Sequence, residues 1–298
     1  MLNAITVDVE EYFHAANIEC VVPPRIWHAQ PSRVEASTDR LLEVFATQSC
    51  RGTFFVLGCV ARRHPALVRR IADAGHEIAS HGYGHRLVTA QTRKAFARDI
   101  RKSKFLLEQV VGREVVGYRA PNFSIRDSVL WAYEELVAAG YRYDSSLHPV
   151  AHPRYGNTHR ATEAALQQTP AGPLILIPLT VLRLQLGNRE FRLPVAGGAY
   201  WRLFPRLWTL FALSRCATKG APYLNTYLHP WEIDVGQPRF SELPIATQIR
   251  HYGGTASLEG TVAAVMQRFP SVPLSEIILS LERLGALHPQ HTSAAVPT

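Results

Sequence analysis

Two histidines and an acidic pair are the side chains best suited to chemistry in this chain. His81 and His85 are four residues apart, with Gly82 and Gly84 between them. A helical or tightly turned backbone directs two imidazoles at this spacing toward one point, and glycine permits such a turn. An upstream carboxylate would complete a three-ligand set of the kind found in metal-dependent hydrolases. The pattern therefore predicts a metal site at this turn.

Asp8 and Glu10 are the candidates for that carboxylate. They are two residues apart, so an extended backbone places both side chains on one face. One carboxylate can then ligate a cation while the other stays free as a base. Glu11 makes the run acidic, and a solvated loop or helix cap is the alternative interpretation. On residue types alone, either Asp8 or Glu10 can be the ligand.

Short β-branched or aromatic runs alternate with longer amphipathic patterns in the first half of the chain. This rhythm is typical of βα units around a parallel sheet or barrel. We expect strands at 4–9, 53–57, 77–79, 115–118, 174–177, 185–186 and 223–228, and helices at 37–48, 64–74, 92–111, 128–139, 200–213 and 274–284. The sequence predicts one domain over residues 1–285, which is irregular at about 147–222 and extended at about 235–285, followed by a disordered tail at 286–298.

In such an architecture the loops at the carboxyl ends of the strands form the site. Each notable polar side chain falls at such a position. The acidic pair follows the first expected strand and the two histidines follow the third, while Arg119, Asp144 and His229 come at or near the ends of later strands. Their convergence is more informative than any single motif.

Composition excludes several classes of protein. The net charge is +8, from 32 Lys and Arg against 24 Asp and Glu, yet the basic residues are scattered and lack the interleaved aromatics of nucleic-acid binders. The four cysteines show no CxxC spacing, and the chain opens without a signal-like segment, so we expect a cytoplasmic protein. Basic helices and the apolar stretch 200–213 leave open a peripheral association with the inner face of a membrane.

Five motifs in order carry a resemblance to a known family. They are Thr6-Val7-Asp8-Val9-Glu10, Thr53-Phe54-Phe55-Val56, the run from His76 to His85, Arg119-Ala120-Pro121 and Leu228-His229-Pro230. This order resembles the polysaccharide deacetylases (NodB homology domain, carbohydrate esterase family 4), whose fold is a distorted (β/α) barrel. The acidic opening through Phe13, Asp144-Ser145-Ser146 and the ending through Asp234 resemble the branch associated with exosortase/PEP-CTERM exopolysaccharide loci.

The resemblance implies metal-assisted hydrolysis of N-acetyl groups on the sugars of an exopolysaccharide or its glycan precursor. By position it gives Glu10, His81 and His85 as ligands of one divalent ion, with Zn²⁺ expected. It gives Asp8 as the general base, His229 as the general acid and Arg119 as the partner of the base. The backbone N–H of Asn122 falls where the family polarises the acetyl carbonyl.

The chain also departs from the family pattern. Asp8-Val9-Glu10 stands where adjacent aspartates are usual, and the greater reach of glutamate favours Glu10 as the ligand. Asn122 replaces an aromatic residue, so stacking on the sugar would fall to Trp231, Tyr83, Phe123 or Tyr155. Asp144 is a further candidate for substrate binding, with a turn cap as its alternative.

Two other functions compete with deacetylation. One is hydrolysis of a cyclic amide, as in the allantoinase-like branch of the fold, which need not retain a metal. The other is a carbohydrate-binding barrel without turnover. The complete ligand set argues against the first, and the presence of both Asp8 and His229 argues against the second.

Overall fold

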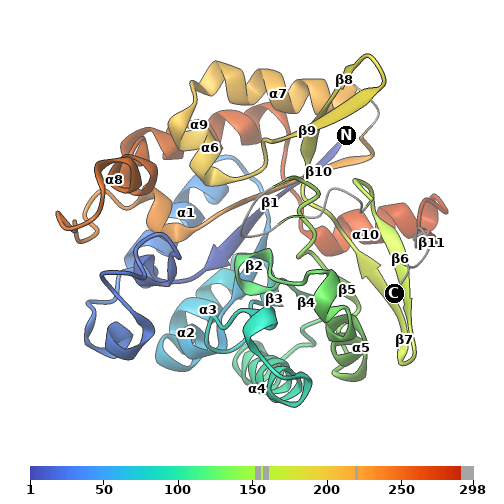
Figure 1. Cartoon of the computed structure of the whole chain (residues 1–298), viewed down its shortest axis with the longest axis horizontal. Coiled ribbons are helices and arrows are strands. Elements are labelled where there is room, and N and C mark those ends of the chain that lie inside the picture. Colours follow the sequence, from blue (N-terminus) through green and yellow to red (C-terminus); the bar gives the residue numbers. More distant parts are fainter. Residues whose placement is uncertain (152–155, 157–160, 219–220, 290–298) are drawn as a thin grey trace.

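A mostly parallel sheet runs through the molecule (Figure 1). The structure is a computed structural model that describes residues 1–151, 156, 161–218 and 221–289. Within these residues the sheet has nine strands in the order β10-β1-β2-β3-β4-β5-β7-β6-β11. Its strands are β1 (Leu2–Val9), β2 (Thr53–Val56), β3 (Glu77–Ser80), β4 (Gly117–Tyr118), β5 (Tyr143–Asp144), β6 (Ala165–Thr169), β7 (Gly172–Leu176), β10 (Tyr223–Leu228) and β11 (His288–Pro289). Only β6 and β7 pair antiparallel in it, and β8 (Val181–Leu186) and β9 (Arg189–Pro194) form a separate hairpin.

Helices surround this sheet. Those of the first half are α1 (Val34–Thr47), α2 (Gly58–Arg63), α3 (Pro65–Asp73), α4 (Arg93–Val111) and α5 (Trp131–Ala138). Those of the second half are α6 (Gly198–Leu203), α7 (Arg206–Thr218), α8 (Ile245–Tyr252), α9 (Thr255–Arg268) and α10 (Leu274–Arg283). Short 3₁₀ helices are η1 (Tyr12–His14), η2 (Pro24–Ala29), η3 (Val88–Ala90), η4 (Pro121–Phe123), η5 (Asp127–Val129) and η6 (Pro230–Ile233). In the view of Figure 1, α2 to α5 lie below the central strands and α6, α7 and α9 lie above them, and both groups contribute to one apolar cluster with β1.

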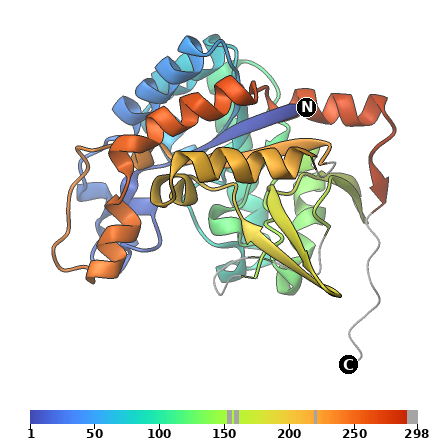
Figure 2. The ribbon, with the colours of Figure 1, turned by 90° about the horizontal axis from the view of Figure 1, so that it is seen from above.

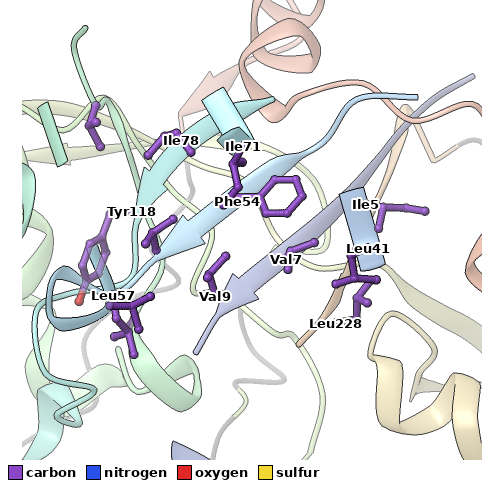
Figure 3. Close-up of a cluster of buried hydrophobic side chains, with 14 of the residues drawn as sticks. Ile5, Val7, Val9, Leu41, Phe54, Leu57, Ile71, Ile78, Tyr118 and Leu228 are labelled. Atoms are coloured by element: carbon purple, nitrogen blue, oxygen red, sulfur yellow. The ribbon is translucent and has the colours of Figure 1, made fainter. Parts of the chain in front are cut away.

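Alternation along β1 separates the core from the future site. Ile5, Val7 and Val9 belong to the large apolar cluster beneath the helices (Figure 3), because alternate side chains of a strand point to opposite faces. Thr6 and Asp8 point to the other face and are buried there. One strand therefore supplies both a packed outer layer and polar groups to the inner face.

The inner face is closed by the segment that follows β7. Ile177 N–H donates to the Asp144 carbonyl of β5 (2.9 Å), and Thr180 N–H donates to the Asn225 carbonyl of β10 (2.9 Å). The buried Asn225 amide then donates to the carbonyls of Ile177 (3.2 Å) and Pro178 (3.1 Å). This segment thus joins the two sides of the sheet by hydrogen bonds, and the expected α/β barrel of deacetylase type is distorted at this point.

Most expected elements are present. The strand at 223–228 is reproduced, and the others in the first half differ by a few residues at their ends. One helix expected at 200–213 is wrong: α6 and α7 are separate helices. Pro205 breaks them because it lacks an N–H, and it leaves Phe204 extended with ψ 153°. Helices α8 and α9 were not anticipated.

Strand pairing joins the two ends of the chain. Strand β10 pairs in parallel with β1 over six residue pairs, so both halves share one sheet. Residues 288–289 of the predicted tail pair with β6, and 290–298 lie outside the described residues, so its predicted disorder stays a prediction. Within the described part of the chain, every helix is too short or too polar to cross a membrane.

Asn225 provides a test of the closure. Replacing it with alanine removes three buried hydrogen bonds and leaves the Pro178 carbonyl without its donor, and we expect the free energy of unfolding to fall by about 2–4 kcal/mol. Urea denaturation followed by circular dichroism measures the change. Asn188 is exposed in the β8–β9 turn, and its alanine variant should stay within about 0.5 kcal/mol of the parent. Equal stability of the two variants would show that the Asn225 amide does not hold the closure.

Candidate active site

Glu10, His81 and His85 meet at the carboxyl ends of β1 and β3, the two strands that flank β2. Glu10 directly follows β1 and His81 directly follows β3. Glu10 Oε2 lies 2.7 Å from His85 Nε2 and 3.9 Å from His81 Nε2. One donor atom from each residue lies within 4.8 Å of the others, and all three side chains are buried. This is the only such three-residue group among the described residues, and it matches the predicted ligands.

Helices α2 and α4 fix the turn that carries the two histidines. Gly58 N–H, at the start of α2, donates to the Gly82 carbonyl (2.9 Å), and Asp99 of α4 accepts from Tyr83 N–H (2.8 Å). Gly82 has φ +76°, which glycine adopts without strain, and His85 has φ +54°, which is uncommon for a side chain of its size. The glycine at 82 is therefore a requirement of the turn that presents His81.

The other polar contacts of His81 and Glu10 use the second ring nitrogen of His81 and the second oxygen of Glu10. The atoms that converge therefore stay available to a metal ion. The other ring nitrogen of His81 lies 2.9 Å from the Arg119 carbonyl, and Trp231 Nε1–H donates to Glu10 Oε1 (3.1 Å). Glu10 Oε2 is buried and faces Nε2 of both His81 and His85. A buried carboxylate oxygen flanked by two imidazole nitrogens fits a divalent cation with a carboxylate and two histidines.

Burial and charge set the protonation of this group. Burial lowers the pKa of His81 to about 4 and that of His14, which stacks on His85 at 5.3 Å, to about 3. Burial alone would raise the pKa of Glu10, but His85 and His229 hold it below its usual range. A neutral His81 beside an ionised Glu10 is the state in which these side chains bind a metal.

Asp8 is held inside the barrel by Arg119. Arg119 is fully buried, and its Nη1 lies 2.7 Å from both Asp8 Oδ1 and Thr6 Oγ1. Its other nitrogens donate to Ser145, and its guanidinium lies 4.1 Å from the centre of the Phe55 ring. Asp8 therefore has a strong partner on one oxygen, while Glu10 turns toward the histidines. The geometry favours Glu10 as the ligand and leaves Asp8 as the base.

His229 lies across the site from Arg119. Its Nε2 is 3.6 Å from Glu10 Oε1 and 4.0 Å from Asp8 Oδ2, and its Nδ1 is 3.1 Å from Glu232 Oε2. Burial lowers the pKa of His229, but Glu10, Glu232 and Asp8 outweigh it and raise the pKa to about 9. A cation bound to Glu10 would weaken the effect of Glu10 on the pKa of His229 and leave Glu232 as the main partner of His229. His229 is therefore placed to carry a proton.

A cavity of about 930 Å³ opens onto this group. Glu10, His229, Trp231 and Asn122 are among its lining residues. Asn122 has φ +50°, a left-handed conformation that asparagine tolerates better than aromatic residues do. The cavity is large enough for several sugar-sized groups, so the reacting residues lie at the end of a site for a larger molecule.

The structure gives two of the aromatic candidates for sugar stacking other contacts. Trp231 is stacked between His229 (5.1 Å) and His251 (4.8 Å), and it bonds Glu10, so it positions both residues and presents little free ring to a sugar. Tyr83 is outside the cavity lining; its ring lies 3.6 Å from Lys102 Nζ and against Gly58, where it anchors the turn. Tyr155 lies outside the described residues.

Asp144 is also placed away from the substrate. It is fully buried at the end of β5, where it accepts hydrogen bonds from the Ser146 N–H (3.0 Å) and hydroxyl (2.5 Å). It does not line the cavity. The turn-cap alternative describes its contacts, and its role in substrate binding stays a prediction.

Sequence reasoning missed three residues of the site. His14 stacks on His85, Glu232 bonds the ring of His229, and the buried Arg202 donates to Glu232 (3.1 Å). The spacing of His229 and Glu232 within the last motif was a usable signal, because residues three apart in a tight turn face each other. Arg202 gave no such signal, because it lies about 30 residues away on α6.

The sequence matches two family models. The one described as polysaccharide deacetylase matches residues 28–143, and one described as a domain of unknown function (DUF3473) matches residues 145–279. Residues 28–143 thus match the polysaccharide deacetylase family. Strand β10, which pairs with β1, comes from the second region, so the family's site is built from both.

Curated relatives and a solved structure agree with this assignment. A peptidoglycan deacetylase of Helicobacter pylori is 32% identical over 113 residues, which are 38% of this chain and 38% of that protein. A chitooligosaccharide deacetylase of Rhizobium leguminosarum bv. trifolii is 41% identical over 66 residues, 22% of this chain and 31% of that protein. The chain thus spans about a third of the length of the curated relatives it matches. A crystal structure from Mycobacterium smegmatis, assigned to the polysaccharide deacetylases, matches the fold with a TM-score of 0.67 at 21% sequence identity. The match covers 100% of this chain and 94% of that chain, so the two proteins share a fold.

Removal of one predicted ligand tests the metal site. The variant His81→Ala loses one of three donors, and we expect its affinity for Zn²⁺ to fall at least about a hundredfold in isothermal titration calorimetry. His28 is exposed on η2, away from the cluster, so His28→Ala should bind Zn²⁺ like the parent. Equal affinity of the two variants would place the metal elsewhere.

The buried carboxyl group of Asp144 makes the free energy of unfolding depend on pH. Burial raises its pKa from 3.8 to about 7, so its contribution to stability is full below the ordinary pKa and is lost as pH rises through about 7. Between pH 4 and 8 the free energy of unfolding of the parent should therefore fall relative to that of Asp144→Asn, by roughly 4 kcal/mol at most. Parallel denaturation curves at each pH measure this difference. A difference that stays constant with pH would show that Asp144 is ionised throughout.

Proposed function

We propose that this protein is a metal-dependent hydrolase that removes N-acetyl groups from the sugars of an exopolysaccharide or its glycan precursor. One observation carries the proposal: Glu10, His81 and His85 converge, with Asp8 and His229 beside them at the end of one cavity. The relatives named above support N-acetylated glycans as the substrate class. DUF3473, which is typical of the exopolysaccharide branch, supports that choice over peptidoglycan. The link to exosortase loci and the cytoplasmic location stay predictions.

The chain's own residues account for the proton transfers. When bound by Glu10, His81 and His85, a divalent ion such as Zn²⁺ supplies Lewis acidity to the acetyl oxygen and lowers the pKa of the attacking water. Asp8 takes a proton from that water as its oxygen attacks the carbonyl carbon. Arg119 orients Asp8 by a charged hydrogen bond, because the pair is buried and 2.7 Å apart.

His229 completes the reaction on the leaving group. The C–N bond breaks as His229 delivers a proton to the sugar nitrogen, so acetate and a free amine are released. Glu232 holds the His229 ring by Nδ1 and thereby directs Nε2 toward the site. The Asn122 N–H, at the cavity wall, is proposed to donate to the acetyl oxygen as negative charge develops there.

Acetate release from an N-acetylglucosamine oligomer in the presence of Zn²⁺ tests the proposal. Asp8→Asn keeps the shape of the base but cannot accept the proton, and we expect kcat to fall about 10²–10⁴-fold with Zn²⁺ affinity within a few-fold of the parent. Asp39 forms an exposed ion pair with Arg70, so Asp39→Asn is a matched control and should keep parental kcat.

Three outcomes separate the competing functions. Glycan binding without acetate release by the parent would favour the carbohydrate-binding barrel. Ring opening of allantoin without acetate release would favour the cyclic-amide hydrolase. Full activity of Asp8→Asn would remove Asp8 from the role of base.

A further inference from the structure

An exposed apolar surface lies beside the mouth of the cavity. It is formed by α6, α7 and α8, which contact one another through α6, and we call it the α6–α8 surface. It consists of Leu203, Phe204, Leu207, Trp208, Phe211 and Ile249, which are between 39% and 79% exposed. Leu203 and Ile249 also line the cavity, so the surface continues into the site. Single exposed apolar residues are ordinary, but a continuous group of this kind marks a binding surface.

The hairpin β8–β9 lies beside α7 (Figure 2). Leu184 pairs with Phe191 across the hairpin, and both are exposed on one face. The opposite face carries Arg183 and Arg192, which both pair with Glu190. An amphipathic ribbon of this kind has one face suited to an apolar medium and one suited to water.

The charged side chains around the α6–α8 surface are mostly basic. Residues 181–194, 198–218 and 245–252 contain seven arginines and one acidic residue, Glu190. Arg206, Arg215 and Arg250 are exposed, and none of them forms an ion pair with another described residue. Exposed arginines around large apolar and aromatic side chains complement an anionic lipid surface, because the rings enter the headgroup region while the cations meet the lipid phosphates.

The basic helix α4 does not offer the same combination. Arg93 pairs with Glu134 and Glu135, and Lys104 pairs with Glu108, so much of its charge is neutralised within the chain. It also lies at the opposite edge of the molecule from α7 (Figure 1). The two helices therefore cannot rest on one flat membrane together.

We propose that the α6–α8 surface docks on an anionic lipid membrane and brings the cavity to N-acetylated glycans attached to lipid at that membrane. The choice of substrate rests on the proposed deacetylation, whereas the docking does not. Leu203 and Ile249 join the docking surface to the cavity wall, so a glycan that rises from the bilayer beside α6 reaches the cavity directly.

Sedimentation with vesicles tests the docking. The parent should bind vesicles of phosphatidylglycerol and phosphatidylcholine, and bind phosphatidylcholine alone more weakly. The triple variant Leu207→Ser, Trp208→Ser, Phe211→Ser should bind the anionic vesicles at least about tenfold more weakly, because three apolar side chains no longer enter the interface. None of these three residues lines the cavity, and all are exposed, so the fold should be retained in circular dichroism.

A matched control removes exposed apolar side chains elsewhere. Phe105 on α4, Leu279 on α10 and Leu284 are 50–76% exposed, and their triple serine variant should bind vesicles like the parent. Equal loss in both triple variants, or no binding by the parent at low salt, would overturn the proposal. A parent that sediments as a dimer, becomes monomeric in the first triple variant and ignores vesicles would assign the surface to a second copy of the chain.

Acetate release separates the docking from the chemistry. On a soluble oligomer the first triple variant should match the parent, and on the same oligomer anchored to anionic vesicles it should be at least about tenfold slower. Vesicle binding without acetate release from either substrate would refute the deacetylase function but retain the docking. Equal rates of parent and variant on the anchored oligomer would refute the docking-dependent delivery.

Discussion

The buried pair of Arg119 and Asp8 is the interaction on which the site depends. Both side chains lie on the inner face of the barrel, where they are 0% and 2% exposed. Removing two charges from water is costly, and the cost is offset only if each remaining donor and acceptor is also paired. Thr6, Ser145 and the face of Phe55 meet the guanidinium from three different strands or strand ends. The barrel therefore has to close correctly around this arginine for the charge to be tolerated.

That requirement couples the proton acceptor to the metal ligands. The carbonyl of Arg119 lies beside one ring nitrogen of His81 and so orients the other nitrogen toward Glu10. Asn225, which joins the barrel across its closure, donates to Ser145, and Ser145 also accepts from Arg119. A shift of β4 or β10 would thus move the base and a ligand together. Rigid placement of this kind limits the loss of rate that comes from misaligned groups.

The second half of the chain controls the other side of the site. His229, Trp231 and Glu232 follow β10, and Arg202 connects Glu232 to the end of α8 through the carbonyls of His251 and Gly253. The same α6 that supplies Arg202 also supplies Leu203 to the cavity wall and to the exposed apolar surface. The proposed proton donor, the cavity mouth and the proposed docking surface are therefore parts of one packed unit, distinct from the loops that hold the proposed metal ligands.

The sequence alone indicated much of the first half of this arrangement. Regular alternation of strand and helix patterns placed β1, β2, β3 and α4, and the spacing of His81 and His85 with an acidic pair indicated the metal cluster, because these signals are local. Residue types alone did not separate Asp8 from Glu10, and the family resemblance and the reach of glutamate favoured Glu10 as the ligand. The contact of Asp8 with Arg119, more than a hundred residues away, is a tertiary observation that supports this choice. It also assigned Tyr83 and Asp144 to substrate, because residue type cannot show that one packs beneath Lys102 and the other caps a buried turn. Tertiary structure decided those roles and the placement of Arg202, since long-range packing determines which polar groups are buried and with which partner.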